Sequence, residues 1–208
     1  MAFQISHKKS VSARELDEAV DACTRAYVGE LASNSMVGGD ESLKDPIFRA
    51  MIRAGELAGQ VYLATDDDSG KVVAVAVWYP PGTALFNSEE QRALGFDHFY
   101  KNLLPDTKAF WDTTYVPVVD EFLAEGVDDS FYLNLIATDP DFQKRGIATA
   151  LLKTVHNKFV GTDAKPMFAH CAANEPNARF YESCGYSVAG KMYMEAPTGN
   201  YPVIVLTK

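Results

Sequence analysis

Residues 131–148 of the 208-residue chain read FYLNLIATDPDFQKRGIA, and this stretch decides the fold. Residues 131–137 are a nearly continuous apolar run, which is typical of a strand covered on both faces. Asp139 and Pro140 end that run. From Ile147 onward, apolar residues recur at every fourth position, which predicts a helix with one buried stripe. The sequence therefore predicts a strand, a basic turn and a helix in direct succession.

The turn between this strand and this helix has the features of an anion-binding loop. The first N–H groups of a helix have no partner inside it, and the helix dipole places positive charge at the same end. Gly146 lets the main chain approach a ligand, while Lys144 and Arg145 add positive charge. The letters match neither GxxxxGK[ST] nor GxGxxG, so both nucleotide-loop motifs are excluded. On spacing alone, a structural turn and a phosphate-binding turn both remain open.

Two blocks of the sequence resemble the GNAT acyltransferase superfamily. Residues 143–148 are similar to its signature Q/R-x-x-G-x-G/A, with Ala148 in the second glycine position. In the second block, Asn174 stands seven residues before Tyr181, and a glycine and an aromatic residue follow shortly after. In that superfamily the first block holds the pyrophosphate of acetyl-CoA. The resemblance therefore implies the same role for this turn.

The resemblance covers about residues 62–208, and residues 78–82 are similar to a puromycin-acetyltransferase-like branch that includes fungal members. It implies an α/β (α+β) fold of one domain over residues 1–208. The expected sheet is mixed and mostly antiparallel, with about seven strands flanked by helices and with central parallel strands that splay apart. Residues 80–130 are expected to be a helical, aromatic-rich insertion, because aromatic side chains recur there within helical patterns.

The activity implied by the resemblance is an acetyl-CoA-dependent N-acetyltransferase. It would transfer an acetyl group to the amine of a small molecule by direct attack on the thioester. A protein or peptide N-acetyltransferase and a non-catalytic acyl-CoA-binding sensor are the alternatives. The residues expected to bind the acetyl-CoA cosubstrate are Ile136, Ala137, Thr138, Gln143, Lys144, Arg145, Gly146, Ile147, Ala148, Thr149, Asn174 and Asn177.

Two residues are candidates for proton transfer. Tyr181 matches the tyrosine whose phenol can protonate the departing thiolate in the family, although the pair of Phe180 and Tyr181 alone would be read as helix core. The strand before the signature turn carries Tyr132 and Asn134 where members of the family that have a general base often place Glu or His. His170 on the next strand is the best titratable alternative, and a hydrogen-bonded histidine without a catalytic role fits its position equally well.

Trp78 and Tyr79 are candidates for the acceptor site. The two prolines that follow them cannot continue a sheet ladder, so the chain must turn away there. Either aromatic side chain can then line the pocket for the amine. Core packing is the alternative for both, because strands often end in buried aromatic residues.

Composition limits the possible partners. The formal net charge is −9 and the sequence pI is about 4.9, which disfavours nucleic acid and favours a cationic amine. Three cysteines without CxxC spacing indicate reduced thiols in a cytoplasmic protein and argue against a metal site. No apolar run is long enough for a membrane span, so no membrane partner is expected. The oligomeric state stays open.

Before residue 80 the pattern predicts a strand, a helix over residues 12–28, a loop over 29–42, a second helix from Asp45 and a hairpin of two strands. Ser12 and Glu15 form a capping box for the first helix. The loop is expected because residues 29–42 are rich in glycine, serine and asparagine.

Overall fold

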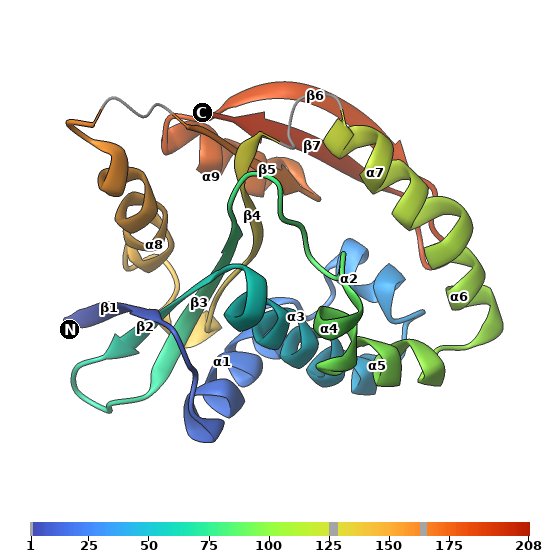
Figure 1. Cartoon of the computed structure of the whole chain (residues 1–208), viewed down its shortest axis with the longest axis horizontal. Helices are drawn as coiled ribbons and strands as arrows, with labels where there is room; N and C mark the ends of the chain where they lie inside the picture. Colours follow the sequence, from blue (N-terminus) through green and yellow to red (C-terminus); the bar gives the residue numbers. More distant parts are fainter. Residues whose placement is uncertain (1, 125–128, 163–165) are drawn as a thin grey trace.

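The computed structural model describes residues 2–124, 129–162 and 166–208, and these form a layered α/β structure around one sheet (Figure 1). The seven strands lie in the order β1-β2-β3-β4-β5-β7-β6. Every neighbouring pair is antiparallel except β4 and β5, which are parallel. The strands are β1 (Phe3–Lys8), β2 (Gln60–Asp66), β3 (Val72–Tyr79), β4 (Ser130–Thr138), β5 (Met167–Ala172), β6 (Ser187–Met194) and β7 (Tyr201–Thr207). The predicted mixed, mostly antiparallel sheet is confirmed.

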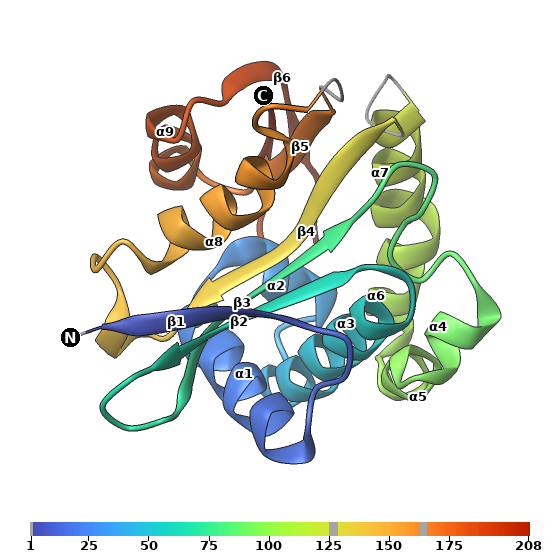
Figure 2. The same ribbon diagram turned by 60° about the vertical axis from the view of Figure 1, so that its left-hand side comes forward.

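Helices cover both faces of this sheet (Figure 2). The α-helices are α1 (Ala13–Ala26), α2 (Leu31–Met36), α3 (Lys44–Ala58), α4 (Glu89–Ala93), α5 (Phe96–Asn102), α6 (Pro105–Phe110), α7 (Val116–Ala124), α8 (Ile147–His156) and α9 (Glu175–Ser183). Short 3-10 turns lie at Glu41–Leu43, Pro140–Phe142 and Asn157–Phe159, and a π-helical turn joins α6 to α7 at Trp111–Tyr115.

The core has two halves, one on each side of the sheet. Helices α1 and α3 pack on one face, and α8 and α9 pack on the other. Strand β3 lies between them, and all eight of its residues, Val72–Tyr79, are buried. A strand covered on both faces is apolar throughout, which is why β3 and β4 show so little alternation in the sequence.

The predicted N-terminal helix is confirmed, and its capping box is present. The Ser12 hydroxyl accepts a hydrogen bond from the Glu15 N–H, and the Glu15 carboxylate accepts one from the Ser12 N–H at 2.9 Å. The prediction of a loop over residues 29–42 is wrong in part, because α2 forms there. Both carboxylate oxygens of Glu30 cap this helix, accepting from the N–H groups of Ala32 and Ser33 at 3.1 and 2.7 Å.

The aromatic segment after β3 is helical in the part that the structure describes, as expected. It contains α4 to α7, while residues 125–128 of the predicted insertion lie outside the described residues. The segment contacts α2 through a buried hydrogen bond of 2.8 Å, which the Trp111 indole N–H donates to the Met36 carbonyl. Ser35 in turn meets Thr198 of the β6–β7 turn, with 2.8 Å between the two hydroxyl oxygens. The segment and α2 therefore lie across one end of the sheet.

Within the described residues, no helix has both the length and the apolar character needed to cross a membrane.

Candidate active site

The two parallel strands separate partway along their length. Their ladder runs from the pair Ser130 and Met167 to the pair Leu133 and His170. Beyond it, β4 continues to Thr138 against β3 alone, and β5 continues against β7 alone. The predicted splayed strands are thus present, and they leave an opening in the sheet.

A bulge in β4 begins where the strands part. Leu133 pairs with Trp78 and Leu135 pairs with Val77, so Asn134 has no partner residue on β3. Such an extra residue bends the strand and redirects its side chain. The amide oxygen of Asn134 is buried without a hydrogen-bond partner and lies in the wall of the central cavity. No role for Asn134 at the cavity was predicted, because a bulge has no signature in a mostly apolar strand.

The main chain of β4 faces the opening at alternate residues. The Ile136 carbonyl accepts a hydrogen bond from the Tyr27 hydroxyl at 3.0 Å, and the Thr138 carbonyl accepts one from the Gln143 side-chain amide at 3.1 Å. The N–H and carbonyl groups of one residue in a strand point to the same side, and successive residues alternate between the two sides. The N–H groups of Ile136 and Thr138 therefore point into the opening, and the N–H group of Ala137 points toward β3. The main chain of Ile136 and Thr138 therefore faces the opening, whereas Ala137 also lines the cavity but pairs through its main chain with Val75 of β3.

The basic turn after β4 forms a concave surface of N–H groups. Lys144 and Gly146 adopt left-handed backbone angles, with φ of 61° and 80°, and α8 begins at the next residue. A turn of this kind directs successive N–H groups to one side, where they can surround an anion. A Cβ added at Gly146 would meet no protein atom within 4 Å. The glycine is therefore required by its backbone angle and by open space in front of it, not by packing.

Most of the predicted cosubstrate residues of this turn line the cavity, as Gly146 does. The others that do so are Gln143, Lys144, Ile147, Ala148 and Thr149. Arg145 differs: its guanidinium donates to the Asp141 carbonyl at 2.6 Å and lies 4.8 Å from the centre of the Phe142 ring. Its side chain therefore braces the turn, and only its main chain remains available to a phosphate.

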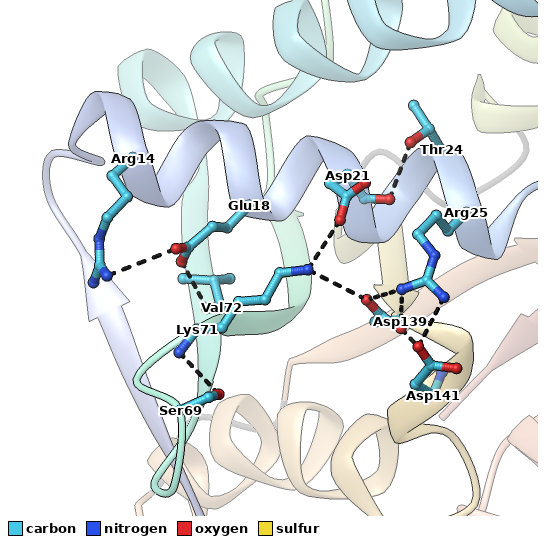
Figure 3. Close-up of polar contacts among 10 residues, drawn as sticks. All are labelled: Arg14, Glu18, Asp21, Thr24, Arg25, Ser69, Lys71, Val72, Asp139 and Asp141. Atoms are coloured by element: carbon cyan, nitrogen blue, oxygen red, sulfur yellow. Dashed lines mark hydrogen bonds and ion pairs between the residues drawn. The ribbon is translucent and has the colours of Figure 1, made fainter.

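Charged side chains fix the start of this turn to α1 (Figure 3). Asp139 is 1% exposed, and its carboxylate receives one guanidinium nitrogen of Arg25 at 2.8 and 2.7 Å. The second terminal guanidinium nitrogen of Arg25 donates to the Asp141 carboxylate at 2.9 Å. Lys71 lies 3.8 Å from Asp139 and 3.0 Å from Asp21. The buried carboxylate is thus neutralised from two sides, and α1 holds the turn in place.

The second motif block forms the other side of the opening. Asn174 caps α9, with its side-chain oxygen accepting from the Asn177 N–H at 2.8 Å. Asn177 and Tyr181 line the cavity, whereas Asn174 is not among the residues that do. Asn174 therefore has the capping role that the sequence allowed for it, and Asn177 is the asparagine better placed to meet a ligand.

His170 and Tyr181 lie together at this wall, with ring centres 4.3 Å apart. The Leu133 carbonyl lies 2.7 Å from Nδ1 of His170. Because a carbonyl only accepts, Nδ1 carries the proton and Nε2 has the free lone pair. Burial lowers the pKa of His170 to about 4 and raises the pKa of Tyr181 far above its usual value. At neutral pH the imidazole is neutral and the phenol is protonated.

Trp78 and Tyr79, the residues expected at the acceptor site, do not line the cavity. Trp78 is fully buried, and its ring packs edge-on against Phe168 and His156 at 5.9 and 6.1 Å. Tyr79 is 1% exposed and belongs to the core on the other face of the sheet. Both residues belong to β3, and helices cover both faces of this strand. The two side chains therefore pack in the core, which was the alternative to a place at the acceptor site.

The opening leads into a large cavity of about 1110 Å³. One end of it lies at the basic turn and the start of α8. The other end lies among α2, α3 and the aromatic segment, where Phe86, Phe96, Trp111 and Tyr115 form part of the wall. A single continuous cavity therefore connects the anion-binding turn with an aromatic chamber, and Tyr181 and His170 stand in its wall.

Comparisons with known proteins agree with this geometry. Residues 114–188, which include the splayed strands, the turn and α9, match the model of the acetyltransferase (GNAT) domain. No curated protein matches the sequence. A solved structure from Corynebacterium glutamicum, described as histone acetyltransferase HPA2 and related acetyltransferase, has a TM-score of 0.64 at 16% identity, covering 100% of this chain and 96% of that one.

Two insect structures are similar as well. The putative arylalkylamine N-acetyltransferase 7 of Aedes aegypti has a TM-score of 0.64 at 13% identity, over 99% of this chain and 86% of its own. The polyamine N-acetyltransferase of Drosophila melanogaster has a TM-score of 0.56 at 12% identity, over 99% of both chains. The chain therefore has the fold of the GNAT acetyltransferases, and its residues 114–188 match their domain model. Its place in the puromycin-acetyltransferase-like branch stays a prediction.

The buried carboxylate of Asp139 provides a test of the contact between α1 and the turn. Asp139→Asn removes its charge at constant shape, leaves Arg25 and Lys71 without their buried partner, and is expected to lower the free energy of unfolding by about 1–3 kcal/mol. Asp141→Asn is the matched control, because its side chain is 71% exposed and solvent screens the lost charge. Urea unfolding of both variants measures the difference. Equal free energies of unfolding for the two variants would contradict the conclusion that Asp139 holds the turn to α1.

His170 makes stability depend on pH. Its pKa is about 4 in the folded protein against 6.5 for the free side chain, so the unfolded chain takes up the proton first as pH falls. Stability is full above pH 6.5 and decreases toward pH 4, with His170 accounting for about 2 kcal/mol by pH 5. Urea unfolding at pH 7.5 and pH 5 should show a smaller loss for His170→Asn than for the wild type. His156, whose pKa burial also lowers to about 4, retains its own part of the effect in both proteins.

Proposed function

We propose that the protein is an acetyl-CoA-dependent N-acetyltransferase that acts on the amine of a small molecule. The observation that supports it most is the continuity of the cavity, which runs from the turn at Gly146 past Tyr181 into the aromatic chamber. We propose in addition that the protein acts in the cytoplasm, as its three cysteines without CxxC spacing lead us to expect.

The residues present fit acetyl-CoA. Gly146 keeps the space before α8 clear, the N–H groups of residues 144–148 gather at the positive end of that helix, and Lys144 adds charge at the cavity wall. The N–H groups of Ile136 and Thr138 face the opening through which an extended arm would lie. When bound, acetyl-CoA supplies an acetyl group already activated as a thioester.

The side chains at the opening can then handle the protons of the reaction. Tyr181 stays protonated at neutral pH and can donate its phenol proton to a departing thiolate. His170 is a weak base at neutral pH, because its pKa is about 4. We therefore assign to His170 the positioning of the Tyr181 ring, against which it packs, and to water in the cavity the removal of the ammonium proton. Holding both substrates in one cavity adds the rate advantage of proximity.

The helical segment at the chamber end of the cavity favours a small acceptor over a peptide. A peptide substrate needs an open groove, whereas the segment after β3 lies across this end of the sheet and joins α2 through Trp111. Turnover of acetyl-CoA with a peptide panel but with no small amine would reverse that preference. Binding of acetyl-CoA without turnover of any acceptor would indicate an acyl-CoA sensor.

Gly146→Ala tests the turn. The new Cβ projects toward the bound cosubstrate and strains a residue with φ of 80°, so we expect the Kd for acetyl-CoA to rise roughly tenfold. Gly161→Ala is the control, because Gly161 has φ of 79° and also has no atom within 4 Å. Its strain is the same, but it lies beyond the other end of α8. Calorimetric titration that finds equal affinities for the two variants would exclude the turn as the binding site.

Tyr181→Phe tests the proton donor. Removing the hydroxyl should lower kcat by about 100-fold or more and leave the Kd for acetyl-CoA nearly unchanged. Tyr186→Phe is the control, since that buried hydroxyl lies 3.0 Å from Nε2 of His156 and not at the cavity. Steady-state kinetics on both variants decide the point. A Tyr181→Phe enzyme with wild-type kcat would remove Tyr181 from the mechanism.

A further inference from the structure

The aromatic chamber contains one acidic group that the mechanism above does not use. Among the described residues that line the cavity, Glu30 is the one with a carboxylate. The basic residues there are Lys144 at the anion-binding turn and Arg92, whose guanidinium donates to the Phe86 carbonyl at 3.1 Å. The acceptor end of the cavity thus carries the Glu30 carboxylate as well as the hydrogen-bonded Arg92, and the other end carries Lys144.

The Glu30 carboxylate is held in a fixed position. Its two oxygens accept from the N–H groups of Ala32 and Ser33, so the side chain cannot swing away. A carboxylate carries about four acceptor sites, and two remain for a ligand. A charge that is already oriented binds a cation at a smaller entropic cost than a mobile surface glutamate does.

Three tyrosines share the cavity with this carboxylate. Tyr27, Tyr115 and Tyr201 line the same cavity and lie close enough to Glu30 to interact with its charge. Burial and this charge raise the pKa of Tyr115 to about 12, so its hydroxyl stays neutral. The Tyr201 hydroxyl is buried without a hydrogen-bond partner. A carboxylate with aromatic faces around it is suited to an ammonium group, which both attract.

The rest of the chamber wall is aromatic. Phe86 and Phe96 lie 4.3 Å apart, Phe96 and Trp111 5.5 Å, and Trp111 and Tyr115 4.8 Å, measured between ring centres. This wall offers an apolar surface to the body of the acceptor. It supplies no second acidic side chain among the described lining residues, and Arg92 would repel a second cation.

We propose that Glu30 receives the ammonium group of the acceptor, and that the chamber thereby selects monocationic amines with an aromatic or apolar body. This inference rests on the proposed acetyltransferase function. Glu30, Tyr27 and Tyr181 line the same cavity. The ammonium is thereby collected in the cavity in which the acetyl group would be transferred, and diamines are discriminated against because the described lining residues include no second carboxylate.

The experiment compares Glu30→Asp with Glu30→Asn. Aspartate and asparagine are matched in size and cap helices about equally well, so α2 is preserved in both and only the charge differs. The substrates are phenethylamine, a monocation at neutral pH, and putrescine, a dication. The neutral analogue 2-phenylethanol serves as a competitive inhibitor. Glu182→Gln, which removes an exposed carboxylate of α9 outside the cavity, is the control for net charge.

We expect the wild type to prefer phenethylamine to putrescine in kcat/KM. Glu30→Asn should raise the KM for phenethylamine about tenfold or more above that of Glu30→Asp, as loss of a charge-assisted contact does. The inhibition constant of 2-phenylethanol and the Kd for acetyl-CoA should stay within about twofold, since neither involves this charge. Thermal unfolding of the two variants should coincide.

Three kinds of result separate the possible failures. Equal KM values for the Asp and Asn variants, or a wild type that prefers putrescine, would overturn the role of Glu30 and leave the acetyltransferase proposal standing. A wild type that binds acetyl-CoA and acetylates no amine would overturn both. A parallel loss of 2-phenylethanol binding in Glu30→Asn would show that the residue shapes the chamber and does not read charge.

Discussion

The site depends on the constraint that β4 and β5 share a ladder only from Ser130 and Met167 to Leu133 and His170. Where two strands part, their main-chain polar groups lose their partners and must find others. Here the carbonyl groups of Ile136 and Thr138 are satisfied by Tyr27 and Gln143, while the N–H groups on the same edge remain directed at the opening. Side chains of the protein thus satisfy the main-chain carbonyl groups at this edge, and the main-chain N–H groups are left for a ligand.

Local patterns predicted the elements around this opening well. The strand before residue 139, the turn and α8 follow from signals within a few residues of each other, and the structure has all three. The splayed geometry came from the resemblance alone, because pairing between β4 and β5 is a tertiary property. Trp78 and Tyr79 show the limit of such patterns: when both faces of a strand are covered, alternation cannot say which side chains reach a cavity. Asn134 was missed for a related reason, since a bulge is a matter of register.

Glu30 and α2 were missed because glutamate is not among the residues favoured at an N-cap. The carboxylate takes that role here with two hydrogen bonds, and the helix is completed by contacts distant in sequence. Its end carbonyl at Met36 meets Trp111, and Ser35 meets the β6–β7 turn. Neither contact leaves a trace in the composition of residues 29–42. The glycine, serine and asparagine content of that stretch was therefore a misleading signal.

The end of α1 and the turn that leads into α2 carry Arg25, Tyr27 and Glu30 within six residues. The first grips the strand end before the turn, the second contacts β4 in the opening, and the third faces the aromatic chamber. The two ends of the cavity are therefore anchored within six residues of the chain, on either side of the left-handed turn at Gly29. A change in this short stretch would act on the anion-binding turn and on the aromatic chamber together, whereas a change in the segment after β3 would act on the chamber alone.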